Sequence, residues 1–87
     1  MRTRRLTYQQ VAVIAAFASG FNGETIANTL YLSIYTIRNH IKAAKKKVDA
    51  QNINQLVAWC VHDGRIVVNE DGTASPVRSE FLSHVAQ

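Results

Sequence analysis

Residues 24–48 contain two short amphipathic segments that are separated by only a few residues. Apolar side chains in the second segment recur with the spacing of one helix face, at Ile37, Ile41, Ala44 and Val48. Its other faces carry polar and basic side chains, namely Arg38, Asn39, Lys42, Lys45 and Lys46. Two helices that meet at a tight turn, the second with a basic open face, form the plan of a helix-turn-helix. In that plan the second helix enters the DNA major groove.

Basic residues are concentrated in the first half of the chain. Residues 1–48 contain eight Lys and Arg residues and one acidic residue, Glu24, whereas residues 49–87 contain two Arg and five acidic residues. A surface with this bias attracts polyanions such as nucleic acids. The length of 87 residues and the 47% hydrophobic content indicate one small folded unit.

Four helices are expected, and each follows a residue that can cap its first turn: Thr7, Asn22, Ser33 and Asn52. Thr7 and Gln10 also have the spacing of a capping box. Gly20 and Asp63-Gly64 are expected to end the first and fourth helices, and Tyr31-Leu32 forms the turn before the third. The expected fold class is therefore all-α.

The residues after the fourth helix follow a different pattern. Arg65–Val68 is a short β-prone run, and residues 69–75 have the composition of a turn-rich linker. Ser75-Pro76 is expected to start a last helix, because Pro is favoured at the first helical position. The apolar stripe of that helix would be Val77, Phe81, Leu82 and Val85. We therefore divide the chain into a domain of residues 1–66 and an extension of residues 67–87 that ends in a helix.

The first 66 residues resemble the LuxR-type, or GerE-like, DNA-binding domain. The matching positions are Leu6-Thr7, Gly20, Ile26-Ala27, Leu30, Leu32-Ser33, Thr36-Ile37-Arg38, His40, Lys47-Val48, Asn52, Gln55 and Gly64-Arg65-Ile66. The resemblance implies a four-helix helix-turn-helix domain whose third helix reads DNA and whose fourth helix often supplies a dimer contact.

Carried over by position, the resemblance assigns base contacts to Arg38, Asn39 and Lys42. Arg pairs bidentately with guanine and Asn with adenine, so these side chains suit that role. Phosphate contacts would come from Tyr35, Thr36, Lys45 and Lys46, and from an N-terminal basic arm that includes Arg4 and Arg5. In the family an Asn-Lys-Glu sequence opens the second helix, where this chain has Gly23-Glu24-Thr25. Glu24 would therefore lie close to the DNA backbone.

A homodimer is the expected assembly, because two-fold pairing doubles the length of DNA that is read. Trp59 and Ala58 lie away from the apolar centre of the fourth helix and, with Phe81 of the tail, are the candidate interface. An alternative is that the tail folds back over Trp59 within one chain, which would leave a monomer.

Three function classes stay open from the sequence. The first is a free-standing transcription regulator that binds specific double-stranded DNA with residues 34–48 in the major groove. The second is a sigma-like factor that acts with RNA polymerase. The third is an antagonist that pairs with another regulator through residues 52–63 and the tail.

The residue pattern offers no catalytic site, metal site or cofactor site. One cysteine, Cys60, and three scattered histidines have no zinc-ligand spacing, and no phosphate-binding glycine loop or nucleophile–base motif occurs. The apolar run at residues 11–18 is too short for a membrane span and too rich in alanine for a signal peptide. We therefore expect a cytoplasmic, nucleoid-associated protein that is not an enzyme.

Overall fold

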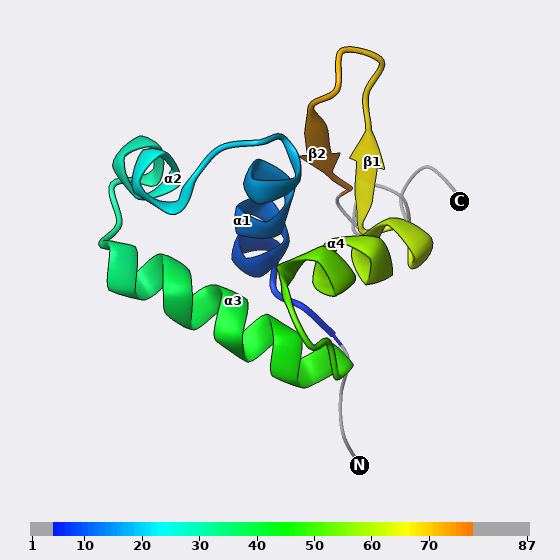
Figure 1. The fold of residues 1–87 in the computed structure, drawn as a ribbon, viewed down its shortest axis with the longest axis horizontal. Helices are drawn as coiled ribbons and strands as arrows, with labels where there is room; N and C mark the ends of the chain where they lie inside the picture. Colours follow the sequence, from blue (N-terminus) through cyan, green and yellow to red (C-terminus); the bar gives the residue numbers. More distant parts are fainter. Residues whose placement is uncertain (1–4, 78–87) are drawn as a thin grey trace, which may run out of the picture.

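The computed structural model describes residues 5–77, which form four helices followed by a β-hairpin (Figure 1). The elements in chain order are α1 (Tyr8–Ala18), α2 (Gly23–Leu30), α3 (Ile34–Val48), α4 (Ile53–His62), β1 (Ile66–Val68) and β2 (Ala74–Pro76). The expected four-helix architecture is confirmed. The β-prone run at residues 65–68 forms β1, but its pairing with a second strand was not expected.

Each helix begins at its predicted capping residue. Thr7 Oγ1 accepts a hydrogen bond from Gln10 N at 3.0 Å, and Gln10 Oε1 accepts one from Thr7 N at 3.0 Å, which completes the capping box. The side chains of Asn22, Ser33 and Asn52 accept from the backbone N–H three residues later. Such caps satisfy N–H groups that a helix itself leaves unpaired, and each contributes about 1 kcal/mol.

The core consists of two clusters of buried side chains, one on each side of α1. Ile14 of α1 packs with Leu56 and Cys60 of α4 in the first cluster, which also includes Ala44 and Val48 of α3. The second cluster joins α1, α2 and α3 through Val13, Ile26, Ala27 and Ile37. Because α1 contributes to both clusters, it holds the helix-turn-helix pair against the rest of the domain.

The turn between α2 and α3 depends on one residue in the left-handed region. Tyr31 has φ 57° and ψ 40°, and its side chain is 95% exposed. Leu32 N donates to Ala27 O at 2.9 Å, and the Leu32 side chain packs against the second cluster. At the other end of α2, a Cβ on Gly23 would lie 2.9 Å from Ile34 Cδ1. The turn at Tyr31 sets the change of direction between the two helices, and the absence of a Cβ at Gly23 leaves room for the end of the Ile34 side chain.

The predictions for the segment after α4 are wrong in two respects. The predicted linker at residues 69–75 forms the tip and second strand of a hairpin, with Val67 paired to Ser75 and Ile66 to Pro76. Pro76 therefore lies in a strand and does not begin a helix. Val77, predicted for the same helix, instead donates its N–H to Arg65 O at 2.8 Å. Residues 78–87 of the predicted helix, including Phe81, lie outside the described residues, and the predicted boundary after residue 66 falls within β1.

Local and distant contacts together explain the hairpin. Within the turn, Asn69 N donates to Thr73 O at 2.7 Å, and Asp71 Oδ1 accepts from both the N–H and the hydroxyl of Thr73. The hydroxyl of Ser19, at the end of α1, accepts from Ala74 N at 2.8 Å. The composition of the turn was visible in the sequence, but the contact with Ser19 was not.

Candidate nucleic-acid interface

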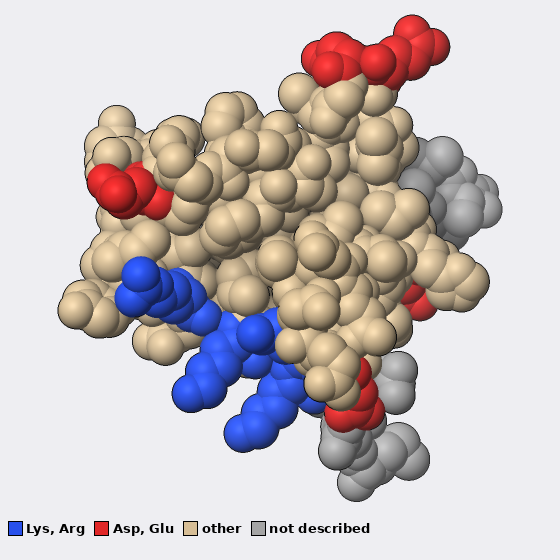
Figure 2. Space-filling model, viewed as in Figure 1, with Lys and Arg blue, Asp and Glu red and all other residues tan. Residues whose placement is uncertain are grey.

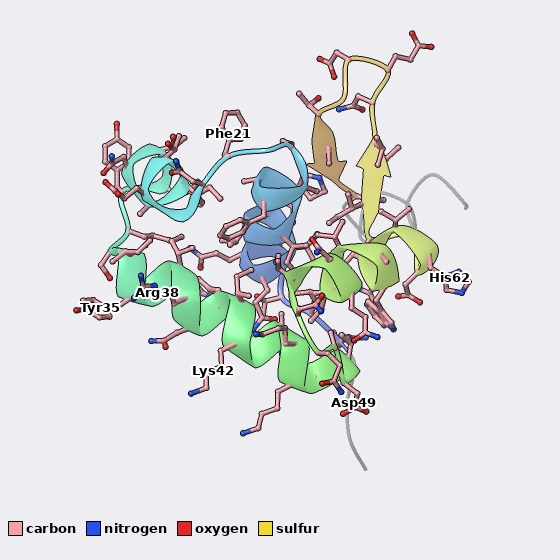
Figure 3. The ribbon with its side chains drawn as sticks, viewed as in Figure 1. Phe21, Tyr35, Arg38, Lys42, Asp49 and His62 are labelled. Carbon is pink, nitrogen blue, oxygen red and sulfur yellow. The ribbon has the colours of Figure 1, made fainter. Side chains whose placement is uncertain are left out.

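Helix α3 separates its side chains into a buried face and an exposed basic face. Ile37, Ala44 and Val48 are buried, as their spacing predicts, whereas Ile41 of the same predicted face is half-buried. The opposite side of the helix exposes the side chains Tyr35, Arg38, Asn39, Lys42 and Lys46. In Figure 3, Tyr35 and Lys42 point away from the body of the domain. Five of the predicted DNA-contacting residues therefore lie on one accessible side of one helix.

The charge on this side of the molecule is uniformly positive along α3. The helix contains five Lys and Arg residues and no acidic residue. Figure 2 shows Lys and Arg side chains gathered over α3, whereas the hairpin tip, which carries Glu70 and Asp71, lies at the far end of the same view. A concentration of cations along a single exposed helix suits a phosphate backbone.

A hollow of about 1060 Å³ lies between α3 and the start of α2. Apolar side chains line part of it, namely Phe17, Ile34, Ile37 and Ile41. Arg38, Lys42 and Lys45 line the hollow from α3, and Glu24 lines it from the first turn of α2. Glu24 is thus the one acidic residue among the residues that line this hollow.

The remaining predicted phosphate contacts differ in how accessible they are. Lys45 is half-buried along the hollow. Thr36 is also half-buried; its backbone N–H donates to Ser33 Oγ at 3.1 Å, and the two hydroxyl oxygens lie 3.0 Å apart. Arg5 is exposed, whereas Arg4 lies outside the described residues. The structure thus places Tyr35 and Thr36 in the first turn of α3 and Lys45 and Lys46 near its other end, so the four residues share one helix but are not adjacent.

The three lysines at the end of α3 have different surroundings. Lys45 lines the hollow, and Lys46 is exposed. Lys47 is half-buried, and its ammonium group donates to Arg5 O and to Gln10 Oε1, each at 3.1 Å. Successive helical residues are about 100° apart around the axis, so three neighbours cannot face one surface. The helical spacing therefore predicts that the three lysines face different surfaces, but it could not identify the hydrogen-bond partners of Lys47.

The predicted dimer residues on α4 are only partly accessible. Ala58 is exposed, but Trp59 is half-buried and packs against the first core cluster. Trp59 is therefore only partly accessible to a partner, because α4 turns part of the indole toward the core. Phe81 lies outside the described residues.

Two findings among the described residues concern thiol reactivity and metal binding. Burial raises the pKa of the Cys60 thiol to about 11, which keeps it protonated at neutral pH. Within residues 5–77, no group of three His, Cys, Asp or Glu side chains could hold a metal ion. None of the helices in this part of the chain has the length and hydrophobicity to cross a membrane.

Comparison with known proteins identifies the family. No curated protein and no solved structure matches the chain. The family model for bacterial regulatory proteins of the luxR family matches residues 4–60, which include α1, α2, α3 and most of α4. These are the elements that present the basic face of α3. Since the match spans more than half of the 87 residues, the chain belongs to the luxR family of bacterial regulatory proteins, which are DNA-binding transcription regulators.

Proposed function

We propose that this protein is a small free-standing transcription regulator that binds specific double-stranded DNA by placing α3 in the major groove. The observation that carries this proposal is the accessible side of α3, where Arg38, Asn39 and Lys42 are exposed over about one turn of helix. A major groove about 12 Å wide admits one α-helix with its side chains. The buried Ile37 behind this turn fixes the helix to the core and so limits the positions these three side chains can adopt.

Different residues would supply specificity and affinity. Arg38 would donate to O6 and N7 of a guanine. Asn39 would donate to N7 of an adenine and accept from its N6 amino group. Lys42 lines the hollow together with Arg38, one turn further along α3, where it would contact a base or a phosphate. The phosphate contacts of this proposal are Tyr35, Thr36, Lys45 and Lys46 of α3, with Arg4 and Arg5 from the N-terminal segment.

The proposed assembly on DNA is a homodimer through α4, with Ala58 at the centre of the interface and Trp59 at its edge. Ala58 is exposed and small, so two copies of α4 could approach closely at this position. Two recognition helices would then read half-sites about 10 base pairs apart, one turn of DNA. We place the protein in the cytoplasm, with the nucleoid.

Selection of bound sequences from a pool of random duplexes tests the proposed function directly. We expect enrichment of a short site that contains guanine or adenine at the positions read by Arg38 and Asn39. The selected duplex should be bound at least tenfold more tightly than a shuffled duplex at the same salt concentration. Absence of duplex binding even at low salt would reject the proposal, because phosphate attraction is strongest there.

Glu24 gives a second candidate function some support. A carboxylate beside the DNA-facing hollow weakens attraction to phosphate, as an antagonist that binds another regulator would require. Such a protein would bind random and selected duplexes equally weakly. It would instead form a stable heterodimer through α4, which sedimentation with a candidate regulator would detect.

A further inference from the structure

The hollow between α3 and the start of α2 has an apolar wall that contact with DNA does not explain. Three of its lining side chains, Phe17, Ile34 and Ile41, are half-buried and keep part of their apolar surface open to solvent. A DNA backbone presents phosphates and sugars, which bind polar and charged groups. A ligand that removes these three side chains from water must therefore carry an apolar part of its own.

The basic side chains of the hollow lie beside this wall on the same helix. Arg38, Lys42 and Lys45 are separated by four and three residues along α3, which places them on one side of the helix. Ile34 and Ile41 are seven residues apart, so they form a stripe next to that basic side. Within residues 5–77, no ion pair neutralises any of the three basic side chains. The hollow thus offers cations and an apolar surface to the same ligand.

This combination distinguishes the hollow from a small cleft between α1 and α2. The small cleft, of about 150 Å³, is lined by Ala16, Phe21, Leu30 and other uncharged side chains. The hollow, of about 1060 Å³, has the size of the largest small-molecule sites, which are mostly apolar with a few polar groups that fix the ligand. Glu24 repels negative charge at the α2 side of the hollow. A ligand with one anionic end therefore fits better than a polyanion.

We propose that this hollow binds a small amphipathic carboxylate, whose hydrocarbon part covers Phe17, Ile34 and Ile41 and whose anionic end meets the basic side of α3. Arg38 and Lys42 line the hollow, so a bound carboxylate makes them unavailable to DNA. The ligand therefore releases DNA from the protein. This regulatory consequence rests on the proposed function, whereas the binding step needs no DNA.

The first test is an NMR titration of the full chain with decanoate, below the concentration at which it forms micelles. The methyl signals of Ile34 and Ile41 and the ring signals of Phe17 should shift together, with half-saturation at about 1 mM or below. Octanoate should bind about tenfold more weakly, because each of the two missing methylene groups contributes roughly a fourfold gain when buried. Decyltrimethylammonium, which has the same chain and the opposite charge, should bind at least about tenfold more weakly than decanoate.

Two variants and one matched control locate the bound decanoate. Ile34→Gln keeps the length of the side chain but removes apolar surface from the wall, and should weaken decanoate binding at least about fivefold. Leu30→Gln makes the same chemical change in the small cleft and should alter the affinity by less than about twofold. Lys45→Gln leaves the apolar wall intact and should weaken binding about threefold, and it tests the proposal even if Ile34→Gln does not fold. Equal losses for Ile34→Gln and Leu30→Gln, or equal affinities of the three probes, would overturn the proposal.

The second test is competition between decanoate and a fluorescent selected duplex, followed by anisotropy. Decanoate should release the duplex from the wild type at the concentrations that saturate the NMR shifts, and Ile34→Gln should require at least about fivefold more. Sodium acetate at the same concentration controls for ionic strength, which by itself weakens DNA binding. Decanoate that shifts the signals of the hollow without releasing the duplex would overturn the regulatory part of the proposal. Failure of the wild type to bind any duplex would reject the proposed function, whereas the NMR titration would still test the site.

Discussion

Ser19 and Ala74 are 55 residues apart in the chain and are joined by a hydrogen bond between the Ala74 backbone and the Ser19 hydroxyl. Ala74 N donates to Ser19 Oγ at 2.8 Å, and the same hydroxyl group lies 3.1 Å from Ala74 O. Ser19 Oγ also lies 2.9 Å from Ala15 O, within the last turn of α1. One hydroxyl group thus joins the end of the first helix to the outer edge of β2, which lies after the region matched by the family model.

Ser19→Ala is expected to destabilise the protein by ~1–2 kcal/mol, because the part-buried Ala74 N–H would lose its partner. For a domain of this size, that loss lowers Tm by roughly 4–16 °C. The change in Tm is measured by thermal unfolding, with circular dichroism as the signal. Ser75→Ala is the control: among the described residues, the Ser75 hydroxyl accepts from the exposed Asn69 side chain, and its loss should cost less than about 0.5 kcal/mol. Equal effects of the two substitutions would contradict the role given to Ser19.

Arg38→Ala and Lys46→Ala should weaken DNA binding in different ways. Loss of Arg38 should cost ~1–3 kcal/mol on a selected site and relax the preference at one base pair. Loss of Lys46 should weaken selected and random duplexes alike and reduce the salt slope by about one unit. Fluorescence anisotropy over a range of salt concentrations measures both quantities. Wild-type affinity of Arg38→Ala for the selected site would remove Arg38 from the base-reading set.

Replacement of Glu24 should strengthen DNA binding. Glu24 lines the same hollow as Arg38, Lys42 and Lys45, so its carboxylate opposes their attraction to phosphate. Glu24→Gln should raise affinity for random duplex a few-fold, and Glu24→Lys should raise it further and add about one unit of salt slope. Glu70→Gln at the hairpin tip changes the net charge equally and should have little effect. If Glu70→Gln raised affinity as much as Glu24→Gln, net charge alone would be responsible.

Ala58→Arg should prevent dimer formation on DNA without unfolding the domain. Ala58 is exposed, so a large charged side chain is tolerated in the monomer but not between two packed α4 helices. Sedimentation velocity with and without the selected duplex measures the assembly. Asn54→Arg, at another exposed position of α4, tests whether added charge anywhere on this helix has the same effect. A wild-type protein that is monomeric both alone and on DNA would reject the dimer.

The buried thiol should make stability depend on pH in the alkaline range. Desolvation raises the pKa of Cys60 from 9.0 to about 11, despite the opposing effect of Arg65. The folded protein therefore keeps a proton that the unfolded chain releases, so this contribution to stability is complete below pH 9 and is lost between pH 9 and about pH 11. It amounts to roughly 2–3 kcal/mol at most. Urea unfolding of the reduced protein at several pH values measures this contribution. Between pH 9 and about pH 11, the free energy of unfolding should fall more steeply with pH for the wild type than for Cys60→Ala.

Much of the helical architecture could be predicted because it depends on residues close together in the chain. The capping bonds of Thr7, Asn22, Ser33 and Asn52 each join residues three positions apart. The buried face of α3 follows from helical periodicity alone. The same periodicity placed the polar and basic residues of α3 on its other faces, and the resemblance to a known family assigned DNA contacts to them.

The sequence by itself therefore determined the helix starts, the buried faces and the basic character of α3, because local backbone bonds and helical geometry settle these features. Only the tertiary structure decided that Lys47 faces inward, that residues 66–76 form a hairpin on α1, and that Trp59 is partly covered by the core. Each of these depends on packing partners tens of residues away. A side chain that meets a distant acceptor or apolar surface cannot be told from its solvated neighbour by residue type or spacing.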